Sequence, residues 1–320
     1  MVVSRRLFLQ AGVGLLPWGA VKPLTMQLDW HLNAQFAGLC VAQAQGYYRR
    51  QGLAVTLNPA TPGMDIVQTV VSNPATVGCA EESLILDAQA RGVDVVAIAA
   101  MLQASPLALM SMPHSGLTTL QQLIGKRVGV HDDGRKALEL VLKQQHIDPL
   151  QLDIIDIPYT GKHKRLINGE FDAVQCYALD EPIDLTRRLG QSPGLLSLKN
   201  YGFDAYSQVI FVASSWLTTQ PRTLHRFLKA TFAGWRWAIA HPSKTAKILV
   251  DHYVEPDYRD INYQTASLKS VANYVQSGGS QPIGVISPQR WQQSTRQLAR
   301  AGLIEKVPPL TTSVDVSLWP

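Results

Sequence analysis

Residues 28–38, LDWHLNAQFAG, combine side chains that can hold a small planar molecule. An apolar strand is expected to end at Trp30 and a helix to begin near Gly38, so the polar residues between them occupy a strand-to-helix turn. Ligands bind at such turns, because the first N–H groups of the helix are unpaired there. An indole offers a flat face for stacking, and amides both donate and accept hydrogen bonds. The candidate contacts are Trp30, His31, Asn33 and Phe36, although an ordinary turn with a core tryptophan and an asparagine cap fits the same pattern.

Other expected strands also end in polar or aromatic residues, and the carboxyl ends of parallel strands meet at one edge of a sheet. The candidates at these junctions and at the expected connections between lobes are Glu81, Glu82, Gln103, Tyr177, Glu181 and Tyr206. A carboxylate accepts hydrogen bonds from ring amino groups while an aromatic side chain stacks on the ring, which suits an aminopyrimidine or a similar heterocycle. Acidic residues at helix starts also complement the helix dipole, so that interpretation stays open.

The segment HDDGRK, residues 131–136, is expected to end one strand and start a helix. Gly134 permits close backbone approach, and Arg135 can form a bidentate pair with an anion. The alternative is a solvated helix start capped by two aspartates.

Strand-like and helix-like segments alternate through residues 25–100 and again through 125–175, which predicts an α/β fold with parallel sheets. The first expected helix spans 37–51, and a strand at 208–213 precedes a helical tail whose third helix spans 256–276. This order predicts two lobes, one formed by 25–104 with 207–320 and the other by 105–206. The chain would then cross a hinge twice, around Leu102–Met112 and Gly202–Gln208, and a cleft on a hinge is expected to close around a ligand.

The chain has 320 residues, 46% hydrophobic and 17% charged, with a net charge of +5. This composition indicates a globular protein, and the mild charge argues against nucleic acid as a partner. Residues 4–10, SRRLFLQ, form a twin-arginine pattern, and the apolar run at 11–20 is too short to span a membrane. Residues 1–24 are therefore predicted to be an export signal. The three cysteines have no metal-binding spacing and are expected to pack in the core.

Several motifs together resemble the periplasmic substrate-binding proteins of ABC importers, and within them the thiamine-pyrimidine group. They are LDW at 28–30 with Asn33 and Gly38, GYY at 46–48, LIGKRVGV at 123–130 and NGEFDA at 168–173. The resemblance covers about residues 25–250. It implies a type II two-lobed fold, a small-molecule ligand, a membrane permease as partner and a periplasmic location. We expect a monomer.

The leading hypothesis is a receptor for a thiamine-precursor pyrimidine, without catalytic residues, cofactor or metal. Trp30, Phe36, Tyr177 and Tyr206 would enclose the ring, Asn33, Glu81, Gln103 and Glu181 would hydrogen-bond it, and Gly134 with Arg135 would hold any anionic tail. One alternative is the family's pyrimidine precursor synthase, which uses pyridoxal phosphate and iron. His31 is the only imidazole available near the first turn, and residues 172–177 hold one cysteine. The other alternative is a receptor for sulfonate- or nitrate-type anions.

Overall fold

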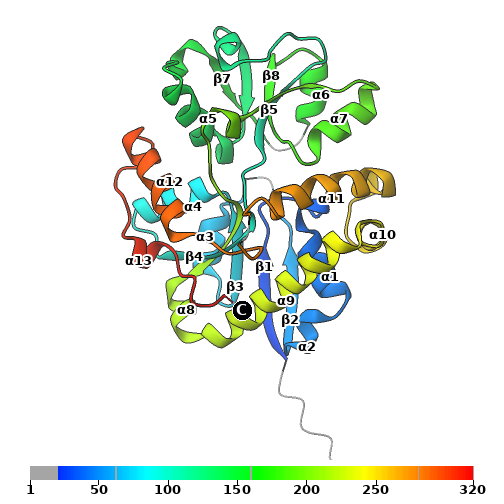
Figure 1. Cartoon of the computed structure of the whole chain (residues 1–320), viewed down its shortest axis with the longest axis vertical. Coiled ribbons are helices and arrows are strands. Elements are labelled where there is room, and N and C mark those ends of the chain that lie inside the picture. The colour runs from blue at the N-terminus through cyan, green and yellow to red at the C-terminus, as the bar shows by residue number, and fades with distance from the viewer. Residues whose placement is uncertain (1–20, 62, 159–160, 280, 320) are drawn as a thin grey trace, which may run out of the picture.

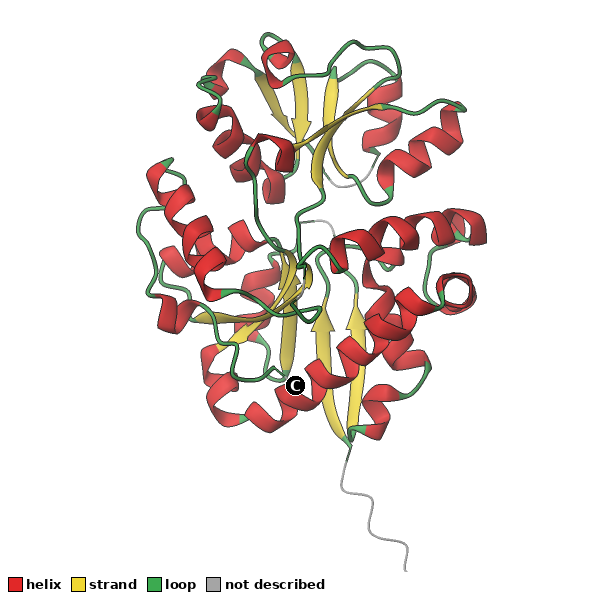
Figure 2. Ribbon diagram, in the orientation of Figure 1, coloured by secondary structure: helices red, strands yellow, loops and turns green. Residues whose placement is uncertain are grey.

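Two five-stranded sheets, stacked end to end in Figures 1 and 2, form the framework of the molecule. The computed structural model describes residues 21–61, 63–158, 161–279 and 281–319, so the twin-arginine pattern and most of the predicted export signal lie outside the described residues. We call the half with the sheet of β1–β4 and β10 the first lobe, and the half with β5–β9 the second lobe. The second lobe is uppermost in Figure 1.

The sheet of the first lobe has the strand order β2-β1-β3-β10-β4. β1 pairs in parallel with β2 and β3, whereas β10 runs antiparallel to β3 and β4. The strands are β1 (Lys22–Gln27), β2 (Leu53–Asn58), β3 (Thr76–Ala80), β4 (Val95–Leu102) and β10 (Ser207–Ala213).

The sheet of the second lobe has the order β7-β6-β8-β5-β9, with β5 antiparallel to both of its neighbours. The strands are β5 (Leu107–Ser111), β6 (Arg127–Val130), β7 (Asp153–Asp156), β8 (Ala173–Tyr177) and β9 (Gly194–Ser197). The predicted parallel pairs are present, but each sheet also contains one antiparallel strand that was not expected to be antiparallel. The chain enters the second lobe through 103–106 and returns through 202–206, and the strand that follows each connection, β5 or β10, runs against its neighbours.

Helices cover both sheets (Figure 2). In the first lobe they are α1 (Ala37–Ala44), α2 (Tyr47–Arg50), α3 (Ile66–Ser72), α4 (Glu82–Ala90), α8 (Ser214–Thr219), α9 (Pro221–Ala240), α10 (Pro242–His252), α11 (Ile261–Val275), α12 (Pro288–Arg300) and α13 (Leu310–Ser313). In the second lobe they are α5 (Asp132–Gln144), α6 (Lys162–Ile167) and α7 (Glu181–Leu189). No helix in the described part of the chain is long and apolar enough to cross a membrane.

Two predicted helices are interrupted. The helix expected at 37–51 divides into α1 and α2 because Gly46 between them has a φ of 69°, which a continuing helix does not allow. The helix expected at 256–276 becomes a short 3₁₀ turn followed by α11, whose start is capped by Asp260 accepting from two backbone N–H groups. Strands β5 and β9 were not expected.

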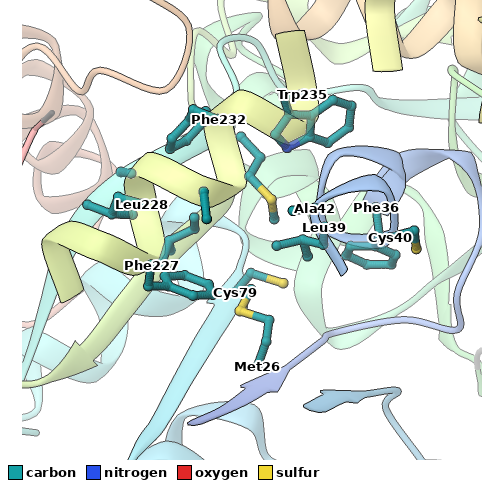
Figure 3. Packing of buried hydrophobic residues seen from close by; sticks show 14 of the residues in the cluster. Met26, Phe36, Leu39, Cys40, Ala42, Cys79, Phe227, Leu228, Phe232 and Trp235 are labelled. Atoms are coloured by element: carbon teal, nitrogen blue, oxygen red, sulfur yellow. The ribbon is translucent and has the colours of Figure 1, made fainter. Parts of the chain in front are cut away.

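The core of the first lobe depends on very close contact between α1 and α9, with Leu39 of α1 and Trp235 of α9 among the buried residues (Figure 3). A Cβ atom added at Gly234 would lie 2.1 Å from the backbone oxygen of Gly38, and one added at Gly38 would lie 2.2 Å from the Trp235 ring. Glycine is therefore required on both helices for them to approach so closely. This contact also anchors the start of α1, which follows the turn predicted to bind ligand.

Gly234→Ala is expected to destabilise the chain by about 2 kcal/mol, because the cost of overpacking exceeds the gain in helix propensity. Urea unfolding followed by circular dichroism would measure the free energy of unfolding. The matched control is Lys229→Ala, which truncates an exposed residue of the same helix. If the two variants were equally stable, the close approach of α1 and α9 would not limit stability.

Candidate functional site

A cavity with a volume of about 30 Å³ lies between the two lobes and is partly open to solvent. Its wall on the first lobe consists of Asp29, Trp30, Gln35 and Gln208. Its wall on the second lobe consists of His131, Asp133, Lys162, Gln175, Cys176, Tyr177, Asp180 and Glu181. Most of these residues follow the carboxyl ends of β1, β6 and β8, where the backbone is exposed toward the other lobe.

Two carboxyl groups in this cavity are held by amide side chains. Gln208 Nε2 donates to Asp29 Oδ2 at 3.1 Å, and Gln175 Nε2 donates to Asp133 Oδ1 at 2.8 Å. Burial raises the pKa of Asp29 to about 7 and that of Asp133 to about 6. Both groups therefore titrate near neutral pH, and hydrogen-bond donors on a ligand would favour their ionised forms.

Lys162 is the cation of the cavity and is almost fully buried. Its ammonium lies 2.6 Å from Glu181 Oε1, donates to the Gln175 backbone oxygen at 3.1 Å and lies 3.1 Å from His131 Nε2. His131 Nδ1 lies 3.0 Å from the backbone oxygen of Ile157, so this nitrogen carries the proton and Nε2 accepts from Lys162. Burial and the neighbouring ammonium lower the pKa of His131 to about 3, so the imidazole is neutral.

Glu181 is the ionised partner of this lysine. Burial alone would raise the pKa of Glu181, but the Lys162 ammonium, the neighbouring His163 and the hydrogen bonds to the carboxylate together lower it. Glu181 Oε2 also accepts from the backbone N–H of Tyr177 at 2.7 Å, which fixes the carboxylate at the start of α7. The ion pair lies beside Trp30, with the Lys162 ammonium 5.7 Å from the centre of the indole ring.

Glu81 is fully buried behind the cavity and accepts hydrogen bonds from three hydroxyl groups. They belong to Tyr177 of β8, to Ser207 at the start of β10 and, at 3.4 Å, to Ser105 in the first connection between the lobes. Burial raises the pKa of Glu81 to about 8. One carboxyl group therefore ties together the first lobe, both connections and an aromatic residue that lines the cavity.

Further contacts hold the lobes together around this cavity. Asn33 Oδ1 caps the turn that follows it by accepting from the Gln35 backbone, and Asn33 Nδ2 donates to Asp180 Oδ2 across the lobes at 2.8 Å. Lys136 of the second lobe lies 3.1 Å from Asp87 of the first. The lobes are closed on one another.

Of the residues predicted from the sequence, Trp30, Tyr177 and Glu181 line the cavity. Glu81 and Asn33 contact lining residues from behind. His31 lines a neighbouring chamber, where its ring lies 4.8 Å from that of Trp30.

The structure places the other predicted residues outside the cavity wall. Phe36 is fully buried in the core of the first lobe, because the turn before α1 directs it inward. The space that a side chain at Gly134 would need is filled by Gln175, whose Oε1 would lie 2.1 Å from a Cβ atom added at Gly134. Arg135 is engaged by Asp156, its Nη2 lying 2.5 Å from a carboxylate oxygen, and by Glu139.

The remaining three predicted residues stabilise the connections between the lobes. Glu82 accepts from the backbone N–H of Tyr206 at 2.5 Å, and Gln103 Nε2 donates to the backbone oxygen of Ala100. The hydroxyl of Tyr206 accepts from the backbone of Ser287, and the guanidinium of Arg290 lies 4.0 Å from the centre of the Tyr206 ring.

Four polar residues of the cavity were not singled out from the sequence. They are Lys162, Gln175, Asp180 and Gln208. Asp29, Gln35, His131 and Asp133 lie within the two segments that the sequence pointed to, 28–38 and 131–136. Asp29 and Asp133 could have been found from their position, because they follow strands β1 and β6. Among the described residues, no three His, Cys, Asp or Glu side chains are grouped so that they could hold a metal ion.

Two lobes joined by two connections are also the fold of a solved ligand-binding component of an ABC-type import system from Staphylococcus aureus. The alkanesulfonate-binding protein SsuA from Xanthomonas axonopodis pv. citri, bound to MOPS, has the same fold, with a TM-score of 0.70 at 15% identity over 92% of this chain and 98% of that chain. The predicted two-lobed α/β fold is thus confirmed. Residues 33–245 match the family described as NMT1/THI5 like, and the chain belongs to this family.

Named relatives of this chain include both a synthase and a binding protein. A 4-amino-5-hydroxymethyl-2-methylpyrimidine phosphate synthase of Legionella pneumophila is 24% identical over 245 residues, covering 75% of this chain and 76% of that protein. The formylaminopyrimidine-binding protein of Halalkalibacterium halodurans is 19% identical over 277 residues, covering 86% of this chain and 84% of that protein. The predicted resemblance to the thiamine-pyrimidine group is confirmed.

The buried Glu81 carboxyl should make stability depend on pH. Its pKa rises from 4.5 to about 8 on folding, so its stabilising contribution is present below pH 4.5 and is lost as the pH rises through 8. One pKa unit corresponds to about 1.4 kcal/mol of free energy. Raising the pH from 5 to 9 should therefore lower the free energy of unfolding of the wild type by at least about 2 kcal/mol more than it lowers that of Glu81→Gln. Urea unfolding at both pH values measures this difference.

The control for this measurement is Glu170→Gln, which removes a carboxylate from an exposed pair with Arg165. This control should show the pH dependence of the wild type. An unchanged pH dependence in Glu81→Gln would mean that the carboxyl does not bind a proton in this pH range.

Proposed function

We propose that this chain is the exported substrate-binding component of an ABC importer and that its ligand is a flat amino-substituted heterocycle of the pyrimidine type. The observation that carries the proposal is the interlobe cavity, which joins aromatic side chains with an excess of carboxyl groups. A formylaminopyrimidine-binding protein among the relatives supports the same ligand class.

The charge of the cavity favours a ligand rich in hydrogen-bond donors. Four carboxyl groups, Asp29, Asp133, Asp180 and Glu181, share the lining with one ammonium, that of Lys162. Ring amino groups can donate to these oxygens, while a sulfonate or nitrate would meet like charge. The receptor for small anions is therefore the weaker alternative for this cavity, although an alkanesulfonate-binding protein shares the fold.

The proposed contacts follow from the positions of the lining residues. Trp30 and Tyr177 would stack on or border the ring, and Asp29, Asp133 and Glu181 would accept from its donors. Asn33 and Glu81 would act from behind the wall by positioning Asp180 and Tyr177.

Transport would require three further properties, each of which remains a proposal. Export would use the twin-arginine pattern at 4–10 and place the protein in the periplasm. Residues 25–104 with 207–320 and residues 105–206 would move as two bodies, opening to admit the ligand. The closed monomer would then deliver its ligand to a membrane permease.

The synthase alternative requires an amine that can bind pyridoxal phosphate, and Lys162 is the lysine in the cavity. Its nitrogen is directed at three acceptors, Glu181, Gln175 and His131, so an ammonium uses all three N–H groups and keeps no lone pair for attack. The present arrangement does not fit a Schiff-base lysine, and this favours binding over catalysis.

Binding measurements test the receptor function. By calorimetry, 4-amino-5-hydroxymethyl-2-methylpyrimidine should bind the wild type, and Trp30→Ala should weaken binding about tenfold or more through loss of stacking. The matched control is Trp216→Ala, which removes another half-buried tryptophan, from α8, and should bind as the wild type does. If ethanesulfonate bound and aminopyrimidines did not, the ligand class would be wrong. If Trp30→Ala bound normally, the ligand would lie elsewhere.

An absorbance titration with pyridoxal phosphate tests the synthase alternative separately. We expect no absorbance band of a Schiff base that borohydride reduces, because the Lys162 ammonium is already paired. A band present in the wild type and absent in Lys162→Met would instead favour the synthase.

A further inference from the structure

A second, larger chamber with a volume of about 370 Å³ adjoins the cavity and is partly open to solvent. We call it the mouth chamber. It shares Trp30, Lys162 and Glu181 with the inner cavity, so these three residues stand between the two spaces. A ligand held by Trp30 in the inner cavity would therefore have room to extend into the mouth chamber.

The first lobe supplies an aromatic wall to the mouth chamber. The ring of His31 lies 4.8 Å from that of Trp30 on one side and 4.9 Å from that of Tyr258 on the other, where the two rings stack at 27°. Burial lowers the pKa of His31 to about 4, so this wall is uncharged at neutral pH. Glu255 also lines the chamber and contributes a carboxylate.

The second lobe supplies the opposite wall, which carries basic side chains from α6 and α7. They are Lys162, His163, Lys164 and Arg188. Arg188 uses Nε to bind Asp184 at 2.7 Å, and its two terminal nitrogens have no hydrogen bond to any residue in the described part of the chain. Lys164 is exposed, and its ammonium likewise forms no hydrogen bond or ion pair with a described residue. These donors are available to a ligand.

The two spaces therefore differ in charge. Four carboxyl groups face one ammonium in the inner cavity, whereas three cationic groups face two carboxylates, Glu181 and Glu255, in the mouth chamber. Arg135, which the sequence offered as an anion contact, is instead paired with Asp156 and Glu139. The available cations thus lie at the mouth.

We propose that the mouth chamber binds an anionic group, a phosphate or a carboxylate, on a ligand whose amino-substituted ring occupies the inner cavity. This inference rests on the proposed function and narrows it. The ligand would have two parts, a donor-rich ring at the acidic end and an anionic tail beside Lys164 and Arg188. Since the aromatic and basic walls come from different lobes, such a ligand would contact both and stabilise the closed arrangement.

The test compares related probes on the purified chain by calorimetry: 4-amino-5-hydroxymethyl-2-methylpyrimidine, its phosphate monoester and its 5-carboxylate analogue. The wild type should bind one or both anionic probes at least about tenfold more tightly than the alcohol, because charge-assisted hydrogen bonds are added. The preference should shrink as salt is raised. The tighter of the two anionic probes identifies the tail.

The variants assign the preference to the mouth chamber. Lys164→Gln and Arg188→Gln should each reduce it about threefold, and the double variant should remove most of it, with alcohol binding unchanged. The matched control is Arg187→Gln. It removes the same charge from the same helix and the same partner, Asp184, but Arg187 does not line the chamber. Arg187→Gln should keep the preference of the wild type.

The outcomes separate this inference from the proposed function. If the alcohol binds as tightly as both anionic probes, or if Arg187→Gln loses as much of the preference as Arg188→Gln, the mouth chamber is not an anion site and the receptor function still holds. If none of the three probes binds, the proposed function and this inference both fail.

Discussion

The arrangement of the two lobes depends on the buried carboxyl group of Glu81. A carboxyl without exposure to water is costly to ionise unless donors surround it, and here the donors are hydroxyl groups from three different parts of the chain. Two of them, Ser105 and Ser207, belong to the connections between the lobes or to the strand start that follows, and the third, Tyr177, lines the cavity. The geometry of the hinge and the shape of the cavity wall are consequently set by the same group. A movement of either lobe would have to break these hydrogen bonds or carry them along.

The neighbouring residue strengthens the same region from the other side. Glu82 accepts from the backbone of Tyr206, whose ring lies under the Arg290 guanidinium, and Arg290 also donates to the backbone oxygen of Gln103. Helices α4 and α12 thus hold both connections. A polar residue near a hinge can either stabilise the connections between the lobes or bind a ligand. Residue type alone does not distinguish these two roles.

Particular residues show how far the sequence could predict the site. Trp30, Tyr177 and Glu181 were predictable, because each ends or follows a recognisable strand whose end faces the cleft. Gln208 was not, because β10 runs antiparallel and brings its beginning, rather than its end, to the cavity. Lys162 stands at the start of the basic run KHKR at 162–165, and such a run normally indicates an exposed face; its burial follows from pairing with Glu181, 19 positions later in the chain. Arg135 was misleading because β7 places Asp156 within its reach.

The carboxyl groups of the cavity explain why a ligand would favour the closed arrangement of the lobes. Bringing the lobes together places Asp29, Asp133 and Asp180 in a space with one ammonium, and burial raises the pKa of all three carboxyl groups. Closing without a ligand therefore either leaves these groups protonated or buries unfavourable charge. A donor-rich ring would relieve that cost only when both lobes contact it, so it would bind the closed form better than the open one. A ligand shifts the equilibrium between the open and closed states by its difference in affinity for them. Here the carboxyl groups of the cavity would provide that difference. Release then requires only that the lobes separate, since water can solvate each carboxylate once the cavity opens.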